Sequence, residues 1–185
     1  MMAMILYIHA METVFVFSDL HGDRHALADI CERVHSEQAD LILFAGDMGI
    51  DRLGGSRSLL GNCGVPIMSV RGNCDSSWAY SAAEMPLPPQ FRHIPWYDRT
   101  LFLTHGHLLH WADGSPIALT ERDIWISGHT HRSQISVRRG EPIMLNPGSA
   151  ANPRDNRPPT YAVITHDCIT ISAVATGAVI ESYLL

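Results

Sequence analysis

The chain has 185 residues, of which 46% are hydrophobic and 17% are charged, so it can bury a core and does not have the composition of a disordered protein. Thirteen Lys and Arg against nineteen Asp and Glu give a formal net charge of −6, which argues against a protein that coats DNA or RNA. No apolar run is long enough to span a bilayer, and the length fits one domain over residues 1–185.

Residues 1–12 are expected to form an N-terminal extension. The segment contains no Lys or Arg and no small-residue cleavage site, which disfavours a signal peptide, and Met11 is an alternative start. The cysteines have no C-x-x-C spacing and no export signal accompanies them, so we expect reduced thiols in the cytoplasm. The four cysteines are Cys31, Cys63, Cys74 and Cys168.

The predicted elements change character midway along the chain. Residues 13–18, 41–45 and 67–70 are apolar runs typical of buried strands, and 24–35 is an amphipathic helix with apolar residues at i, i+3, i+4 and i+7. This alternation predicts βαβ units and a largely parallel sheet. The second half contains seven short strand candidates: 91–94, 99–104, 124–127, 134–137, 143–145, 161–165 and 169–174. The chain is therefore predicted to be α/β, with two packed sheets and helices outside them.

Polar residues directly follow five of the predicted strands. In chain order they are D-L-H (19–21), G-D (46–47), R-G-N-C-D (71–75), H-G-H (105–107) and G-H-T-H (128–131). Because loops at the carboxyl ends of strands converge on one crevice in open α/β sheets, we expect these residues to meet there. The neighbouring glycines permit tight turns and close approach of a ligand to the backbone.

Seven residues of this set carry donor atoms suited to metal ions: Asp19, His21, Asp47, Asn73, His105, His129 and His131. They exceed what a single ion needs, whereas two ions that share a bridging carboxylate would each have about four protein ligands. Nitrogen and oxygen donors without thiolate favour a hydrolytic transition-metal site over a structural zinc site. The D-x-H and H-x-H spacings place both side chains on one side of an extended backbone.

Each motif alone also has a structural interpretation. Asp19 by itself is typical of a helix N-cap or a turn, and Gly46-Asp47 and Gly72-Asn73 are typical of turns. Only their joint occurrence in order, each at the end of a strand, favours a metal centre.

The ordered set D-x-H, G-D, G-N-C-D, H-G-H and G-H-T-H, followed by N-P-G-S at 146–149, resembles the calcineurin-like metallophosphoesterase superfamily, and within it the small YfcE/MJ-type phosphodiesterase group. The resemblance implies a four-layer α/β/β/α sandwich and two divalent metal ions. Manganese is the favoured metal, and Fe, Zn, Ni or Co are the other possible occupants. It implies that Asp47 bridges the two ions and that a hydroxide between them attacks the phosphorus. One ion would be bound by Asp19, His21 and His131, and the other by Asn73, His105 and His129.

One position departs from the superfamily pattern. Its usual G-N-H-(D/E) motif has a His that assists the leaving group, and Cys74 stands there instead, as is common in the small group. A thiol with a pKa near 8.5 is poorly matched to protonating an alkoxide, so we expect Cys74 to shape the site. Leaving-group assistance is then expected from solvent or from His107, which lies two residues from His105.

Several neighbouring residues have two interpretations at this point. Asp75 either orients a metal ligand or stabilises a turn, and Arg154 either grips a phosphate or is a solvated loop arginine. Asn146 and Ser149 are expected to support the site as turn residues. Three aromatic residues near the motif loops could stack on a substrate, with core packing as the default: Trp78, Tyr80 and Trp111.

The sequence favours a cytoplasmic enzyme that hydrolyses a small phosphodiester. The alternatives are a metal-depleted scaffold of the same fold, and a phosphomonoesterase or a nuclease. A complete donor set argues against the scaffold, and no sequence-specific nucleic-acid or membrane partner is expected. Apolar residues at 180 and 183–185 either pair subunits in a homo-oligomer or complete a sheet.

Overall fold

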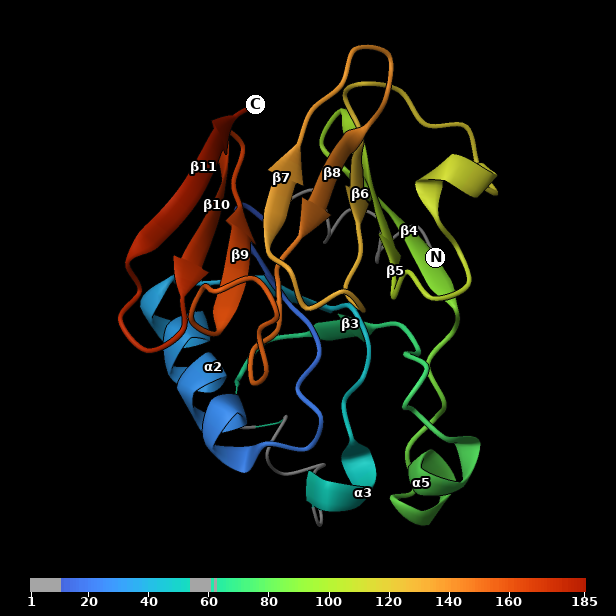
Figure 1. The fold of residues 1–185 in the computed structure, drawn as a ribbon, viewed down its shortest axis with the longest axis vertical. Helices are drawn as coiled ribbons and strands as arrows, with labels where there is room; N and C mark the ends of the chain where they lie inside the picture. Colours follow the sequence, from blue (N-terminus) through green and yellow to red (C-terminus); the bar gives the residue numbers. More distant parts are fainter. Residues whose placement is uncertain (1–10, 54–60, 62) are drawn as a thin grey trace.

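Two mixed β-sheets pack face to face in the computed structural model, which describes residues 11–53, 61 and 63–185 (Figure 1). The six strands of the first sheet lie in the order β11-β10-β9-β1-β2-β3 and the five of the second in the order β4-β5-β6-β8-β7. The first sheet comprises β1 (Val14–Phe17), β2 (Leu41–Phe44), β3 (Ile67–Ser69), β9 (Thr160–Ile164), β10 (Cys168–Ala173) and β11 (Val179–Leu184). The second comprises β4 (Phe91–Trp96), β5 (Arg99–Thr104), β6 (Ile124–Ile126), β7 (Gln134–Ser136) and β8 (Ile143–Asn146).

Strand direction brings the ends of five strands to the same edge of the molecule. In the first sheet β1 is parallel to β2 and β2 to β3, while β9 to β11 join antiparallel. In the second sheet β5, β6 and β8 run parallel between antiparallel edge strands. The parallel strands are those whose ends carry the polar motifs, so the topology supports the expected crevice.

The period-two alternation of strand side chains builds one core on each face of the first sheet. Val14 and Val16 of β1 face the second sheet, whereas Phe15 and Phe17 face the helices, and all four are fully buried. The residues of β2 alternate in the same way. Apolar runs that are buried on both faces explain why these strands could be predicted from sequence.

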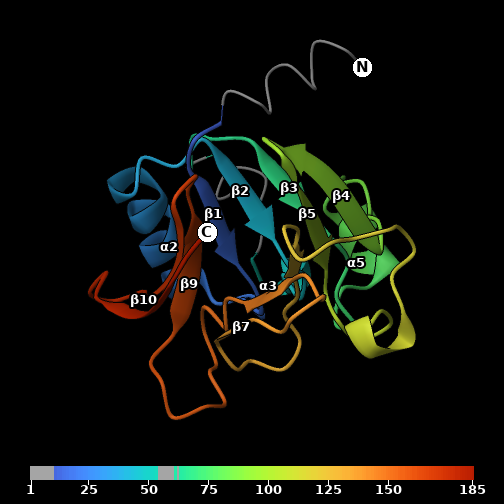
Figure 2. The ribbon, with the colours of Figure 1, turned by 90° about the horizontal axis from the view of Figure 1, so that it is seen from above.

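Helix α2 (Arg24–Ser36) covers the outer face of the first sheet (Figure 2). Asp23 caps its N-terminus by accepting hydrogen bonds from the backbone N–H groups of His25 and Ala26, and Leu27, Ile30 and Val34 form its buried face. Two shorter helices, α3 (Ile50–Leu53) and α5 (Ser77–Ala82), contact each other. None of the helices in the described ranges is long and apolar enough to cross a membrane.

In the described part of the chain, the outer face of the second sheet is covered by a loop with a short 3₁₀ turn, whereas helix α2 covers the outer face of the first sheet. A single 3₁₀ turn, η1 (Trp111–Asp113), places Trp111 edge-on against Trp125, which stacks on Phe102 at a centroid distance of 4.4 Å. The two-sheet α/β sandwich is thus confirmed. Its outermost layer on the side of the second sheet is a loop that packs on the sheet through Trp111.

The prediction of four reduced cysteines is wrong, because Cys31 and Cys63 form a disulfide that links α2 to the segment before β3. The apolar C-terminal residues complete the first sheet as β11. Of the expected extension over 1–12, residues 1–10 lie outside the described residues, and Met11 is buried, with its carbonyl accepting a hydrogen bond from Trp96 Nε1.

Candidate metal centre

The predicted donors come from the loops that follow five parallel strands. Asp19 and His21 follow β1, Asp47 follows β2 and Asn73 follows β3, while the second sheet contributes the rest. His105 and His107 come after β5, and His129 and His131 come after β6. Residues as far apart as 19 and 131 therefore meet in the crevice between the sheet edges.

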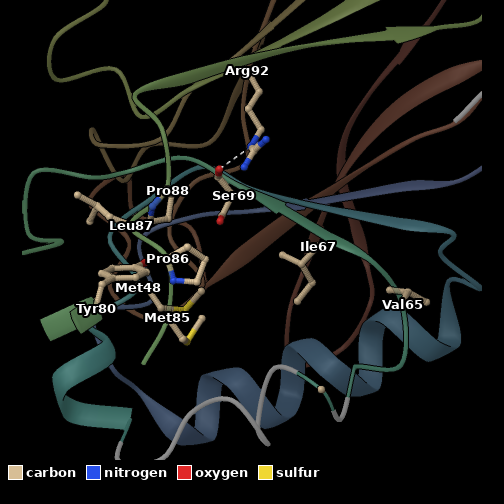
Figure 3. Close-up of a pocket in the computed structure, with 11 residues that line it drawn as sticks. Met48, Val65, Ile67, Ser69, Tyr80, Met85, Pro86, Leu87, Pro88 and Arg92 are labelled. Carbon is tan, nitrogen blue, oxygen red and sulfur yellow. Dashed lines mark hydrogen bonds between the residues drawn. The ribbon is translucent and has the colours of Figure 1, made fainter. Parts of the chain in front are cut away.

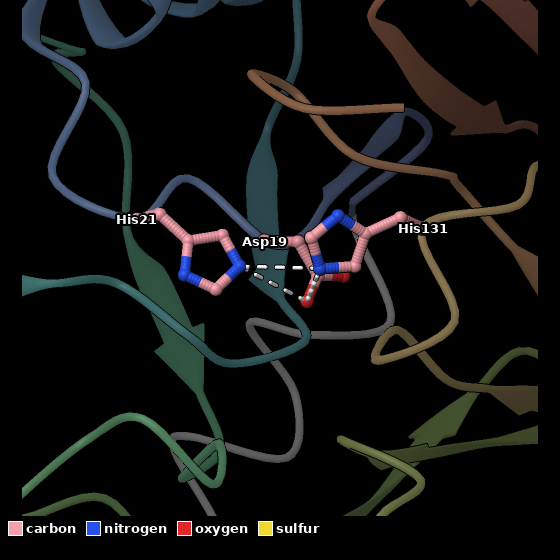
Figure 4. A group of neighbouring side chains, drawn as sticks. All are labelled: Asp19, His21 and His131. Atoms are coloured by element: carbon pink, nitrogen blue, oxygen red, sulfur yellow. Dashed lines mark hydrogen bonds and ion pairs between the residues drawn. The ribbon is translucent and has the colours of Figure 1, made fainter. Parts of the chain in front are cut away.

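Asp19, His21 and His131 form the first group of donors (Figure 4). The Nε2 atoms of His21 and His131 are 3.1 Å apart, and Asp19 Oδ1 lies 3.3 Å from His131 Nε2 and 3.9 Å from His21 Nε2. Asp19 and His131 are buried, and His21 is partly exposed. The group therefore opens to solvent on the side of His21.

A second group adjoins the first through Asp47. Its Oδ2 lies 3.5 Å from His105 Nε2 and 3.8 Å from His21 Nε2, so this carboxylate faces both groups. Asn73 Oδ1 lies 3.0 Å from His105 Nε2. The His129 ring is 5.2 Å from the His105 ring, centroid to centroid. The structure thus brings all seven predicted donors into one cluster with Asp47 at its middle.

The hydrogen bonds of the imidazoles show that this cluster fits cations. His105 Nδ1 lies 2.7 Å from the carbonyl of Ala45 and His131 Nδ1 lies 2.6 Å from the carbonyl of Asn152, so each Nδ1 must donate a proton there. In the neutral rings the Nε2 lone pairs then point at other acceptors. Asp19 Oδ1 is also buried without a hydrogen-bond partner. Facing lone pairs of this kind need a cation between them, and backbone anchoring of the second ring nitrogen is typical of metal-binding histidines.

The electrostatics of the cluster favour positive charge at its centre. Burial alone would raise the pKa of Asp47, but the His105 imidazole and the Cys74 N–H hold it below its ordinary range. Burial alone would lower the pKa of His105, yet Asp47 and Asp19 raise it. The Asp19 carboxylate, with Oδ1 3.3 Å from His131 Nε2, likewise raises the pKa of His131. The Asp47 carboxylate therefore stays ionised and attracts protons or metal ions.

Five of the seven donors lie in the left-handed region of backbone conformation. The φ angles are 53° at Asp19, 50° at His21, 62° at Asp47, 68° at His129 and 59° at His131. Non-glycine residues rarely adopt such angles, although Asp and His tolerate them better than branched residues. These turns redirect the chain at the end of each strand so that the side chains point into the crevice.

Two glycines permit the loops to approach each other. A Cβ on Gly72 would lie 2.0 Å from Asp47 Oδ1, and one on Gly128 would lie 1.9 Å from Ser18 Oγ and 2.8 Å from Asp19 Oδ2. No side chain fits at either position, so these glycines are required by packing against the donors.

Asp75 fixes the loop that carries Asp47. Its carboxylate is buried and accepts hydrogen bonds from the backbone N–H groups of Asp47, Met48 and Gly72 at 2.8–2.9 Å. Of the two interpretations given above, the structure supports an orienting role, exerted through the backbone of Asp47.

The N-P-G-S turn supports the centre from the other side, as predicted. Ser149 Oγ donates to the carbonyl of Asp19 at 2.7 Å, and Asn146 Nδ2 donates to the carbonyl of Gly128 at 2.8 Å. Neither side chain was expected to bind metal, and both instead hold donor-bearing loops in place.

A family model for the calcineurin-like phosphoesterase superfamily domain matches residues 11–168. The chain belongs to this superfamily. It is 28% identical over 176 residues to phosphodiesterase YfcE of Escherichia coli, covering 88% of this chain and 92% of that protein. It is 30% identical over 166 residues to the probable metallophosphoesterase YsnB of Bacillus subtilis, covering 85% and 88%.

Solved structures of this superfamily fold agree with the assignment. The structure of Yfce, a phosphoesterase from E. coli, superposes with a TM-score of 0.76 at 25% identity and covers 92% of this chain and 98% of that one. Vps29 from Entamoeba histolytica superposes with a TM-score of 0.66 at 23% identity, covering 94% and 99%, and shares the fold alone. The chain is thus a phosphoesterase-family hydrolase with residues able to bind divalent metals.

The residue that departs from the superfamily pattern lies beside the cluster. Cys74 is exposed, and its N–H donates to Asp47 Oδ1 at 2.7 Å. Partial loss of solvent around the sulfur and the nearby Asp47 carboxylate raise the pKa of the Cys74 thiol to about 11. The thiol therefore stays protonated and neutral near pH 7.

His107 and Arg154 lie at the rim of the cluster. The His107 ring is 5.2 Å from the His105 ring, and its Nδ1 is buried without a hydrogen-bond partner. Burial and the neighbouring His105 lower the pKa of His107. The Arg154 side chain is exposed, and its backbone N–H donates to the carbonyl of His131 at 2.9 Å.

Sequence reasoning missed the supports that act through main-chain atoms. The carbonyls of Ala45 and Asn152 orient two imidazoles, but a carbonyl leaves no mark on residue type. Asp155 and Arg157 anchor the loop containing Asn152. Asp155 accepts hydrogen bonds from the backbone N–H and the hydroxyl of Ser133, and Arg157 forms an ion pair with Glu181.

Of the three aromatic residues considered for substrate stacking, Tyr80 is buried and Trp78 is 74% exposed.

A hollow of about 430 Å³ lies beneath β3, between the proline-rich segment 86–88 and Ile67 (Figure 3). Its wall is mostly apolar, with Arg92 at one end donating from Nε to the carbonyl of Ser69. None of the seven donors lines it. The hollow and the donor cluster are therefore separate features of the fold.

Proposed function

We propose that this protein is a phosphodiesterase that works with two divalent metal ions on a small phosphodiester. One observation carries the proposal. The seven donors form two groups that meet at Asp47, whose Oδ2 lies 3.5 Å from His105 Nε2 and 3.8 Å from His21 Nε2. Manganese is the metal we favour, with iron, zinc, nickel or cobalt as alternatives that share the same donor types.

The first ion would be held by Asp19, His21 and His131, and the second by Asn73, His105 and His129, with Asp47 shared. When bound, such ions neutralise phosphoryl oxygens and lower the pKa of a coordinated water to about 7. The residues of the chain keep this arrangement rigid: the carbonyls of Ala45 and Asn152 orient the imidazoles.

Substrate positioning is assigned to residues at the rim. His107 is neutral, because burial and His105 lower its pKa, and its partly exposed ring lies 5.2 Å from the His105 ring, where it can contact a substrate or leaving group. Arg154 is exposed and near His131, where its guanidinium could donate two hydrogen bonds to the oxygens of a phosphate. A Cys74 thiol with a pKa of about 11 is a weak acid, so activated aryl esters should be better substrates than alkyl esters.

An enzyme and a metal-depleted scaffold of the same fold are the two functions that most need separating. The test is Mn²⁺-dependent hydrolysis of a chromogenic aryl phosphodiester, with Asp47→Asn as the site variant and Asp113→Asn, at an exposed position on η1, as the matched control. We expect Asp47→Asn to lose at least about a hundredfold in kcat and Asp113→Asn to match the wild type. Equal rates in wild type and Asp47→Asn would refute the metal mechanism.

Leaving-group assistance is tested separately with Cys74→His. If a missing acid limits the reaction, this variant should hydrolyse an alkyl phosphodiester faster while its rate on the aryl ester changes little. An unchanged alkyl-ester rate would show that the thiol position does not limit turnover. A panel of cyclic nucleotides, phosphomonoesters and nucleic acids would then distinguish diesterase from monoesterase and nuclease.

We also propose that the chain acts as one domain in the cytoplasm. The two sheets share one apolar core between them, which supports a single folding unit. Gel filtration would show whether the exposed apolar side chains of β11, such as Val179 and Leu184, pair subunits in a homo-oligomer.

A further inference from the structure

A second polar hollow lies at the opposite end of the second sheet from the metal centre. Its volume is about 300 Å³. Arg99 begins β5, Arg122 precedes β6 and Ile143 begins β8, so the hollow adjoins the amino ends of the strands whose carboxyl ends lead to the donors. Arg138 and Arg139 reach it from the turn between β7 and β8, at the top of Figure 1.

The hollow concentrates positive charge in an acidic protein. Four arginines line it, in a chain that has only thirteen basic residues and a net charge of −6. Glu121 is the one acidic side chain in the wall, and its Oε2 accepts a hydrogen bond from Gly140 N at 3.4 Å. A surplus of guanidinium groups around a concave surface attracts anions.

The four arginines differ in whether their guanidinium groups already have a partner within the protein. Arg122 forms an ion pair with Asp98, and Arg99 donates from Nη1 to the carbonyl of Arg122. Within the part of the chain that the structure describes, neither the Arg138 nor the Arg139 side chain has a hydrogen-bond or carboxylate partner. These two guanidinium groups are thus free to bind an anion. A planar guanidinium can donate two parallel hydrogen bonds to two oxygens of one phosphate.

Apolar side chains complete the wall. Val137 is 48% exposed, and Tyr183 of β11 and Leu185, which follows that strand, line the same hollow as the arginines. A wall of this kind suits a ring or an apolar group attached to the anion, because ligand sites combine an apolar surface with a few convergent polar groups.

We propose that this arginine hollow binds a small molecule carrying a diphosphate on an aromatic or apolar group, such as a nucleoside diphosphate. Arg138 and Arg139 hold the two phosphates, and Tyr183 and Val137 contact the ring. Because the hollow contains none of the metal donors, the ligand is bound and not hydrolysed there. The proposal stands independently of the proposed activity.

The test is calorimetric titration of the full-length chain, as purified and without added metal, with α,β-methylene-ADP and with adenosine. We expect one equivalent of the analogue to bind, and adenosine not to bind. Arg138→Gln combined with Arg139→Gln should weaken binding at least about tenfold, since each removes a charge-assisted contact. The same double variant should unfold at the wild-type urea midpoint, which shows that it folds.

Two controls make the result specific. Arg52→Gln combined with Arg132→Gln removes two exposed arginines elsewhere and should leave binding unchanged. Asp47→Asn should also bind normally, since it alters only the metal centre. Absence of binding at millimolar analogue, equal weakening by the two double variants, or loss of binding in Asp47→Asn would each overturn the proposal.

Discussion

Gly72 is the position where a single methyl group should disable the metal centre without disrupting the core. A Cβ on Gly72 would lie 2.0 Å from Asp47 Oδ1, 2.3 Å from the backbone nitrogen of Asp47 and 2.7 Å from its Cγ. The φ angle of Gly72 is not in the left-handed region, so alanine is compatible with the backbone there. The effect of Gly72→Ala therefore comes from contact with Asp47.

The size of the effect follows from these distances. Ordinary contact for a Cβ begins near 3.4 Å, so Asp47 Oδ1 must move by about 1.4 Å from its present 2.0 Å. Displacements of about 1 Å in a catalytic site can reduce the rate about a hundredfold, and inserting a methyl group into a packed site costs about 1–3 kcal/mol of stability. We expect Mn²⁺-dependent kcat to fall at least about a hundredfold in a chain that still folds.

Hydrolysis of an aryl phosphodiester and elemental analysis of bound metal check this prediction together. Gly114→Ala is the matched control, because Gly114 has a φ of +94° but nothing within 4 Å of the added Cβ. The control should lose stability through backbone strain and keep full activity per folded molecule. Wild-type kcat and metal content in Gly72→Ala would refute the placement of Asp47 in the reaction.

Three further outcomes follow from the same geometry. Asp75→Asn should lower the urea-measured free energy of unfolding by about 1–3 kcal/mol, because an amide cannot replace an acceptor that serves three backbone N–H groups; unchanged stability would contradict this. Asp19 raises the pKa of His131, so the metal-free chain should be stabilised below the ordinary pKa of about 6.5 and lose that stability as pH rises through the folded-state pKa. Metal uptake, by titration, should show the opposite trend, since protons compete for the same imidazole. Reducing the Cys31–Cys63 disulfide, which closes a loop of sequence separation 32, should cost about 3–4 kcal/mol in thermal or urea unfolding; an unchanged midpoint after reduction would speak against the bond.

The parts of the fold that could be predicted from sequence are those set by local pattern. β1 and β2 are buried on both faces, so each is a continuous apolar run flanked by polar residues. The apolar side chains of α2 recur with helical periodicity, and Asp23 caps the N-terminus of this helix. The donor positions follow from the same pattern, because a polar residue after a buried parallel strand must lie at the carboxyl edge of the sheet.

The remaining features depend on contacts between distant segments. Helices α3 and α5 have four and six residues, too few to show a periodic apolar face. Cys31 and Cys63 are brought together by the packing of α2 against the chain before β3, and their spacing resembles no known pairing motif. The arginine hollow gathers residues from four separate segments, and the sequence gives no reason to group them.

The left-handed backbone at five donors links the stability of the fold to its chemistry. Each such angle costs on the order of 1 kcal/mol in a non-glycine residue, and the turns persist because fully buried strands such as β1 hold their ends in place. When His131 is deprotonated, the approach of its Nε2 to Asp19 Oδ1 at 3.3 Å adds a further unfavourable term. A cation bound there would offset both costs at once, since it interacts only with the folded arrangement of donors. The packing of the sheets therefore supplies the free energy that keeps the donors in a geometry they would not adopt alone. Because the core prevents the loops from relaxing, the donors stay together and the site can bind cations.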